Sequence, residues 1–213
     1  MITKPEVTIT PILVGQLAAV DMPIYVHLID HPGGRILVDT GFTELHPAVA
    51  DMEPTIRPLH EQGFDLGSID HIINTHLHFD HCGGNRLFPN VPIYVQRAEL
   101  EDARTQPDYT IPEWVDPSAQ TLNYVSVDGD HELLPGVWLL HTPGHTRGSQ
   151  VVAVDTIDGL GIIAGDTAVW SGELDEPQTE GQHRIVALRP WRGRGPPPKT
   201  PTGAQPRPAP GAP

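Results

Sequence analysis

Three histidines and one aspartate occupy four of six consecutive positions of the chain, in the hexapeptide His76-Leu77-His78-Phe79-Asp80-His81. Neutral imidazole and carboxylate are the groups that zinc and similar divalent metals prefer as ligands. Buried without partners, these side chains would carry a large desolvation cost. A chance histidine-rich surface turn is the competing interpretation, and the density of ligand groups disfavours it. The hexapeptide therefore predicts a site for a divalent metal ion.

The sequence on either side of the hexapeptide predicts how it is held. Residues 69–74 contain a short β-branched, apolar core, which is typical of a buried strand. Cys82-Gly83-Gly84-Asn85 follows, and its two glycines permit tight turns and a close approach of the backbone to an ion. The ligands are therefore expected in a loop at the carboxyl end of a strand, where open α/β folds usually place their chemistry.

Two further candidate ligands come later in the chain. His145 lies in a loop after the apolar residues 137–140, and Asp166 follows the apolar residues 162–164. Taken alone, a loop histidine is more often solvated, and an aspartate after a strand is often only a helix cap. With the hexapeptide present, each repeats the arrangement of a strand followed by a ligand. Both are therefore candidate ligands of the same centre.

Together these segments resemble the metallo-β-lactamase superfamily. The resemblance covers roughly residues 10–175 and rests on the hexapeptide, on Leu-Val-Asp-Thr-Gly at 37–41, on Thr-Pro-Gly-His-Thr at 142–146, and on Asp166. Within the superfamily, the hexapeptide followed by Cys-Gly-Gly-Asn is most similar to the N-acyl-homoserine lactone lactonases. The resemblance implies an αβ/βα sandwich with metals at one edge between the sheets. Here that α/β sandwich is expected to be truncated at its C-terminus, because the last part of the family pattern is missing or replaced.

The resemblance also implies two divalent metal ions, with zinc as the first expectation and manganese, iron or cobalt as alternatives. The first metal would be held by His76, His78 and His145. The second would be held by Asp80 and His81, and Asp166 would bridge the two metals. The family completes its second site with one more histidine well after the bridging aspartate. The only later histidine here is His183, which follows no strand, so the second site is in question.

Five other residues receive supporting roles. Asp39 ends an apolar strand and is expected to accept the second N–H of a metal-bound histidine, with a plain turn as the alternative. Met22, Phe79 and Trp170 are candidates for lining an acyl-chain pocket, with the protein core as the alternative. Cys82 is expected to serve packing rather than to act as a thiolate ligand.

The expected activity is metal-dependent hydrolysis of a carboxylic ester bond. A metal-bound hydroxide would open the ring of a lactone, with N-acyl-homoserine lactones as the expected substrates and quorum quenching as the role. Asp80 and Asp166 are the candidate catalytic residues, because either carboxyl group could carry a proton to the leaving alkoxide. Two alternatives stay open: a thioester hydrolase of the glyoxalase II kind, and a metal-binding but catalytically weak protein that lacks the last histidine.

The composition of the 213-residue chain changes sharply near residue 181. The formal net charge is −14, yet residues 1–180 hold all 27 acidic residues and 7 of the 13 basic ones. Residues 190–213 hold 9 of the 24 prolines. The sequence therefore predicts a hydrolase domain over 1–186 and a disordered Pro/Arg/Gly-rich tail over 187–213. The tail is either an interaction arm or the product of a shifted or shortened reading frame.

The remaining sequence features bear on compartment and partners. The single cysteine fits a reducing compartment, the first residues lack the apolar core of a signal peptide, and no run reaches the ~18 apolar residues that span a bilayer. The expected location is the cytoplasm. The expected partner is a small-molecule lactone, without membrane or nucleic acid, and a homodimer is compatible with the sequence.

Strand and helix patterns alternate along the chain. Pro32-Gly33-Gly34 predicts the turn of a β-hairpin between strands at 24–29 and 35–38. Further strands are predicted at 93–95, 150–154 and 161–164, and helices at 54–62 and 97–104. Strands interspersed with helices predict layered α/β packing.

Overall fold

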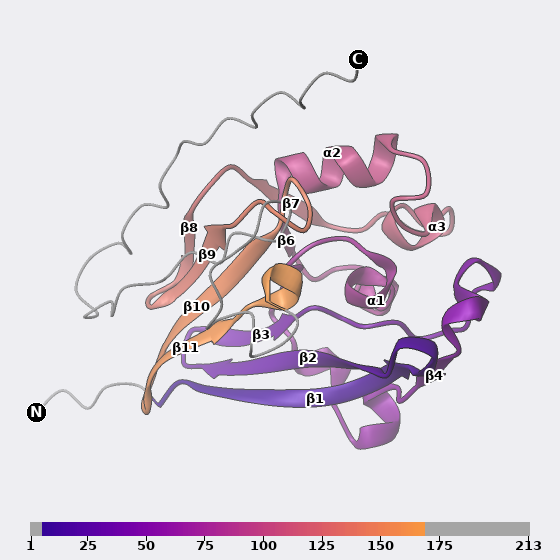
Figure 1. Cartoon of the computed structure of the whole chain (residues 1–213). Helices are drawn as coiled ribbons and strands as arrows, with labels where there is room; N and C mark the ends of the chain where they lie inside the picture. The colour runs from indigo at the N-terminus through magenta and orange to yellow at the C-terminus, as the bar shows by residue number, and fades with distance from the viewer. Residues whose placement is uncertain (1–5, 169–213) are drawn as a thin grey trace, which may run out of the picture.

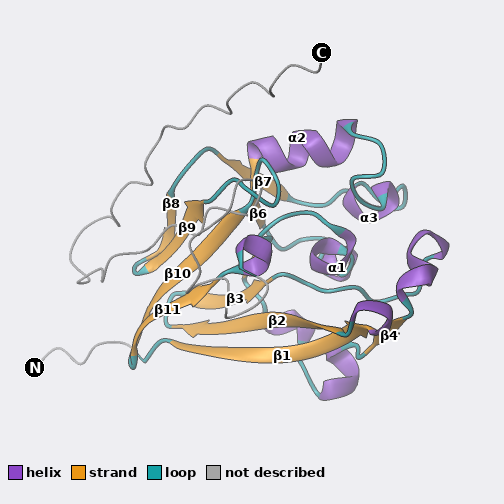
Figure 2. Ribbon diagram, in the orientation of Figure 1, coloured by secondary structure: helices purple, strands orange, loops and turns teal. Residues whose placement is uncertain are grey.

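The computed structural model of the chain describes residues 6–168. Two sheets lie against each other, and the three α-helices gather on one side of the larger sheet (Figures 1 and 2). The larger sheet contains β1 (Thr8–Leu17), β2 (Met22–His31), β3 (Gly34–Val38), β4 (Pro54–Ile56), β5 (His71–Ile73), β6 (Ile93–Gln96) and β7 (Tyr124–Val127). The smaller sheet contains β8 (His131–Leu134), β9 (Val137–His141), β10 (Gln150–Thr156) and β11 (Gly159–Ile163). The helices are α1 (Phe79–Cys82), α2 (Arg97–Thr105) and α3 (Pro112–Val115).

The order of the strands decides where the loops with polar side chains meet. The larger sheet runs β4-β1-β2-β3-β5-β6-β7, with antiparallel pairs up to β3 and parallel pairs from β3 to β7. Val38 of β3 pairs with Ile73 of β5, so the residues that follow these two strands lie at the same edge. The smaller sheet runs β11-β10-β9-β8 and is wholly antiparallel.

One hydrophobic core fills the space between the two sheets. Branched side chains of the larger sheet, including the fully buried Ile29, Ile36 and Ile73, pack against Leu139 and Val152 of the smaller sheet. Alternating side chains of the same strands point to the opposite face, as the twofold period of a strand requires. Both faces of the larger sheet are therefore buried.

A second core lies on the helix side of the larger sheet. Leu37, Ile72 and Ile93 pack there with Phe42 and Trp114, whose indole is 2% exposed. Figure 1 shows α1, α2 and α3 on this side of the sheet. The helices thus cover one face of the larger sheet and the smaller sheet covers the other, which confirms the predicted layered α/β architecture.

Most of the predicted elements form, and one does not. The hairpin of β2 and β3 and the helix α2 confirm the predictions for 24–38 and 97–104. The helix predicted over 54–62 is wrong, because this segment forms the short strand β4 and a 3-10 helix, Leu59–Gln62. Pro58 lies between the two, and a proline inside a helix removes a backbone hydrogen bond.

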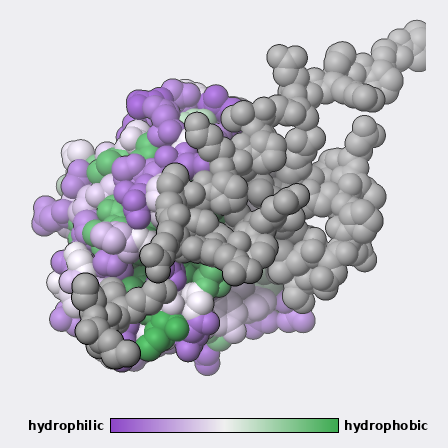
Figure 3. All heavy atoms as spheres, turned by 90° about the vertical axis from the view of Figure 1, so that its left-hand side faces the viewer, coloured by the Kyte–Doolittle hydropathy of each residue, from purple (hydrophilic) through white to green (hydrophobic). Residues whose placement is uncertain are grey.

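Some sequence predictions fall outside the described residues. The domain boundary at residue 186, the tail 187–213, His183 and Trp170 all lie beyond residue 168. In the part of the chain that the structure describes, no helix is long and apolar enough to cross a membrane. The described surface seen in Figure 3 mixes hydrophilic and hydrophobic residues, with the hydrophobic ones in separate patches.

Candidate metal centre

Three segments that follow strands bring the hexapeptide and the later candidate ligands together. The hexapeptide begins three residues after β5 and continues into the short helix α1, which carries Asp80 and His81. His145 lies in the connection between β9 and β10. Asp166 lies in a 3-10 helix, Gly165–Thr167, directly after β11. The larger sheet thus supplies the hexapeptide and the smaller sheet supplies the two later residues, at one common edge.

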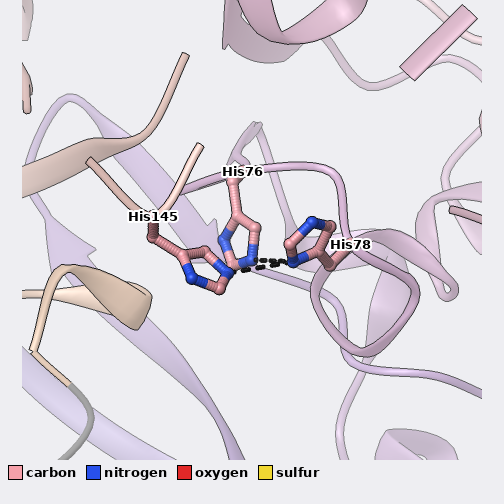
Figure 4. Close-up of side chains that lie close together, drawn as sticks. All are labelled: His76, His78 and His145. Atoms are coloured by element: carbon pink, nitrogen blue, oxygen red, sulfur yellow. Dashed lines mark hydrogen bonds between the residues drawn. The ribbon is translucent and has the colours of Figure 1, made fainter. Parts of the chain in front are cut away.

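The imidazoles of His76, His78 and His145 converge on one point, as Figure 4 shows. Nδ1 of His78 lies 3.1 Å from Nε2 of His76 and 2.9 Å from Nε2 of His145. The His76 and His78 rings, and the His78 and His145 rings, meet edge to face, so that each ring directs a nitrogen inward. Asp166 adds a fourth group, with Oδ2 3.4 Å from Nε2 of His145 and 3.9 Å from Nε2 of His76.

These separations suit a tetrahedral metal ion. Zinc binds imidazole nitrogen at about 2.0–2.1 Å, so the edges of its coordination tetrahedron are about 3.3 Å long. The four distances above, 2.9, 3.1, 3.4 and 3.9 Å, scatter around that value. The donor set of three imidazoles and a carboxylate is also one that divalent zinc accepts. The residues present therefore fit a metal ion at this position.

A second cluster lies beside the first and shares Asp166 with it. Nε2 of His81 lies 3.3 Å from Oδ1 of Asp166 and 3.6 Å from Oδ2 of Asp80. Asp166 therefore turns one carboxylate oxygen toward each cluster. Within residues 6–168, ligand atoms of His76, His81 and Asp166 lie close together, and Asp80 joins this second cluster through its contact with His81. His183, the only histidine after Asp166 in the sequence, lies outside the described residues.

Asp39 holds the orientation of His81. Its Oδ2 lies 2.8 Å from Nδ1 of His81, while its Oδ1 and Oδ2 accept hydrogen bonds from the backbone N–H and the hydroxyl of Thr75. Asp39 is 3% exposed and has a φ of 60°, a left-handed conformation that is uncommon outside glycine. Nδ1 of His81 is occupied by this contact, so Nε2 is the nitrogen directed at Asp80 and Asp166.

The backbone carbonyl of His81 accepts hydrogen bonds from a buried polar network that the sequence analysis did not predict. It accepts from the backbone N–H and the hydroxyl of Thr40 and from the side-chain amide of Asn74. Asn85 connects the two, because it accepts from Thr40 and donates to Asn74. Asn74, next to the hexapeptide, and Asn85, in the Cys-Gly-Gly-Asn segment, are fully buried, which for an amide requires such partners.

The protonation of the cluster follows from burial and from the neighbouring charges. Burial, and then the nearby His145 and His81, lower the pKa of His78 to about 4. Burial also places the pKa of His76 well below its usual value. Burial acts to raise the pKa of Asp166, but its hydrogen bond to His81 and the surrounding imidazoles outweigh this and hold the value at about 2. Neutral imidazoles and an ionised carboxylate are the forms that bind metals.

His81 differs from the other histidines. Burial lowers its pKa, but Asp80, Asp39 and Asp166 together raise it well above the ordinary value. Both ring nitrogens of His81 therefore face carboxylates, Nδ1 facing Asp39 and Nε2 facing Asp80 and Asp166. His27 of β2, which the sequence interpretation passed over, interacts electrostatically with Asp39 and His81, and burial lowers its pKa.

The candidate substrate-lining residues lie near this edge but are partly occupied by packing. Phe79 is half-buried, with its ring centroid 6.0 Å from that of Phe42 and 6.5 Å from that of Trp114. Met22 is half-buried against the helix-side core. Cys82 is fully buried and its thiol donates to the carbonyl of Leu77, so its sulfur contacts the protein core rather than the donor clusters.

Replacing Asp39 by alanine is expected to weaken metal binding by about 10–100-fold, because outer partners of ligating histidines typically contribute that much. The effect should fall mainly on the cluster of His81, whose Nδ1 loses its acceptor. The measurement is the metal dissociation constant by competition with a chromophoric chelator. Asp65→Ala is the matched control, because Asp65 only caps an exposed 3-10 helix. Equal affinities in the two variants would contradict the role of Asp39.

Comparisons with known proteins give one consistent family. A model of the metallo-beta-lactamase superfamily matches residues 19–201 of the chain. An N-acyl homoserine lactonase from a Bacillus species is 39% identical over 166 residues, which cover 70% of this chain and 63% of that protein. An N-acyl homoserine lactonase from Bacillus cereus is 36% identical over 187 residues, which cover 79% of this chain and 71% of that protein.

A solved structure adds the same likeness in three dimensions. An N-acyl homoserine lactone hydrolase, with the product N-hexanoyl-L-homoserine bound at its catalytic metal centre, aligns with a TM-score of 0.63 and 30% identity. The alignment covers 78% of this chain and 77% of that one. The chain thus matches most of a lactonase domain, but it spans less than two thirds of the first Bacillus lactonase above.

Proposed function

Because the chain belongs to the metallo-β-lactamase superfamily, we propose that it is a metal-dependent hydrolase that opens the ester ring of lactones, with N-acyl-homoserine lactones as substrates. The corresponding biological role is quorum quenching. Divalent metal ions are what the family implies, and zinc is the ion that we propose. The likeness to lactonases at 36–39% identity supports this substrate class over others in the superfamily.

One observation carries the proposal. Two donor clusters lie side by side and share the carboxylate of Asp166, with Oδ1 turned toward His81 and Oδ2 toward His145. A largely buried array of four imidazoles and two carboxylates has no structural advantage without a cation, since packed apolar side chains would fill the same space at lower cost. We therefore propose His76, His78, His145 and Asp166 as ligands of the first metal, and Asp80, His81 and Asp166 as ligands of the second.

Metal ions bound in this way lower the pKa of water, polarise the substrate carbonyl and stabilise the leaving oxygen. The protein itself must orient the ligands and deliver a proton to the leaving alkoxide. Asp80 and Asp166 are the two carboxyl groups that could do so. Burial raises the pKa of Asp80, whereas that of Asp166 is held at about 2. These opposite directions favour Asp80 as the proton carrier and Asp166 as an ionised ligand.

The test is metal analysis and a substrate panel on one preparation of the full chain. The panel contains an N-acyl-homoserine lactone, a glutathione thioester and a cephalosporin. We expect bound metal and turnover of the lactone above the other two. Preferred turnover of the thioester would establish the glyoxalase II-like alternative instead.

A metal-binding but catalytically weak protein is the second candidate. It is favoured by the second cluster, where within residues 6–168 the converging group is His76, His81 and Asp166, with Asp80 in contact with His81 alone among them. About one bound metal and no turnover of any substrate would identify this case. About two bound metals with lactone turnover would mean that another residue replaces the missing histidine, and would exclude this case.

A further inference from the structure

We propose that Glu99 is a positioning residue that fixes the separation of the two loops carrying His76, His78 and His145. The inference rests on the metal site proposed above. The two loops belong to different sheets, and beside them the backbone N–H of Gln150 donates to the carbonyl of Thr75, just before His76. Glu99, at the start of α2, touches both.

The carboxylate of Glu99 connects the two loops through its two oxygen atoms. Its Oε1 accepts the backbone N–H of Leu77, between His76 and His78, at 2.8 Å. Its Oε2 accepts the hydroxyl of Thr146, next to His145, at 2.6 Å. One planar carboxylate therefore spans both loops, and each oxygen is bonded to a residue adjacent to a proposed ligand.

A third contact of Glu99 reaches His78 by another route. Its Oε1 also accepts the hydroxyl of Tyr109 at 2.6 Å. The ring of Tyr109 lies against the imidazole of His78, with 5.1 Å between the ring centroids. The phenol is thus anchored at its oxygen by Glu99, while its ring limits the rotation of His78.

The surroundings of Glu99 leave it little freedom to move. Its side chain is fully buried, and it lies in the first turn of α2, where the helix dipole favours a negative charge. A Cβ atom at Gly148 would overlap the backbone and Cβ of Glu99, so the His145 loop passes directly over this turn. A buried carboxylate with three donors is fully satisfied, and its removal would leave these donors without their acceptor.

A neighbouring residue of α2 provides a built-in comparison. Asp102, one turn further along, forms a bidentate pair with Arg147 of the His145 loop. Unlike Glu99, it is not bonded to the loop that carries His76 and His78. Asp102 is 7% exposed, hence also a buried carboxylate on the same helix. Removing Asp102 should cost stability without changing the distance between the two loops. A loss of metal affinity that occurs only on substitution of Glu99 would therefore reflect the lost connection between the loops rather than general damage to α2.

The experiment compares four full-length variants by their binding of cobalt(II), a spectroscopically visible substitute for zinc. We expect Glu99→Ala to weaken metal binding by about tenfold or more, the range seen for outer partners of metal ligands, and to alter the visible cobalt absorption. We expect Glu99→Gln to restore wild-type affinity, because its carbonyl oxygen can still accept from Leu77 and Tyr109 while its amide donates to Thr146. Asp102→Ala is expected to bind cobalt like the wild type. Thr146→Val, which removes the contact with Oε2, is expected to fall between wild type and Glu99→Ala.

The outcomes separate this inference from the proposed function. Wild-type affinity and an unchanged cobalt spectrum in Glu99→Ala would overturn the positioning role, as would an equal loss in Asp102→Ala. If Glu99→Ala does not fold, an unchanged affinity and spectrum in Thr146→Val overturn it instead. A wild-type chain that binds no cobalt would instead refute the proposed metal site itself.

Discussion

Asp166→Asn is expected to bind fewer metal ions than the wild type and to lose more than about a hundredfold of its lactone turnover. Outer partners of metal ligands already contribute about 10–100-fold, and a group that faces both clusters should contribute more. The substitution keeps the size of the side chain but removes the charge and one acceptor oxygen. Since Oδ1 faces His81 and Oδ2 faces His145, neither cluster keeps its full donor set.

The measurement pairs elemental analysis of the purified variant with the initial rate of lactone hydrolysis. Asp158→Asn is the matched control, because Asp158 is an exposed residue in the turn between β10 and β11. The control should keep both the metal content and the rate of the wild type. If Asp166→Asn retained two metals and full turnover, the shared-carboxylate arrangement would be excluded.

The fold was predictable where the local pattern and the tertiary environment agree. The hairpin of β2 and β3 carries β-branched residues on both sides of a Pro-Gly-Gly turn, and it forms as predicted. The segment 54–62 reads as a helix locally, yet Pro54–Ile56 pairs with the edge of β1 instead. A backbone ladder with a strand some 40 residues earlier is a tertiary effect that local propensity does not contain.

The candidate ligands were predictable because each follows an apolar strand in sequence. The structure brings all six together, including His145 and Asp166 from the other sheet. The resemblance to the metallo-β-lactamase superfamily, which these residues carry, is confirmed by the family match over 19–201. Their roles as ligands stay a proposal, which the metal analyses above test.

The residues that hold the ligands were harder to predict, because their partners are distant in sequence. Glu99 bonds to Leu77, 22 positions away, and to Thr146, 47 positions away. In the sequence it stands in the helical pattern of α2, where an acidic residue in the first turn is ordinary. Its burial follows only from the packing of two loops over the helix. The roles of Asn74 and Asn85 were also not predicted, although both lie within a few residues of the hexapeptide.

Removal of metal is expected to lower the melting temperature by about 10 °C at neutral pH. A ligand at about 1,000 times its dissociation constant stabilises the native state by about 4 kcal/mol, and each kcal/mol shifts the melting temperature of a chain of this size by about 2–4 °C. Thermal unfolding followed by circular dichroism, with and without a chelator, measures the difference.

The metal-free protein should also become less stable as the pH falls from about 6.5 to about 4. In the unfolded chain these histidines titrate near 6.5, whereas burial lowers the pKa of His78 to about 4 and that of His76 well below its usual value. The unfolded state therefore takes up protons first, and the free energy of unfolding decreases through this window. His81 has a raised pKa, so its contribution is complete below 6.5 and is lost only as the pH rises.

The decisive comparison is between the metal-free wild type and metal-free His78→Asn at pH 7 and pH 5. Asparagine does not titrate, so the variant should lose less stability on acidification than the wild type. The exposed His60 supplies the control, since His60→Asn should behave like the wild type. Parallel pH curves for the wild type and His78→Asn would mean that His78 is not held in its neutral form. Because divalent metals bind neutral imidazole, a neutral His78 in the metal-free protein would mean that the fold already prepares this ligand for metal binding.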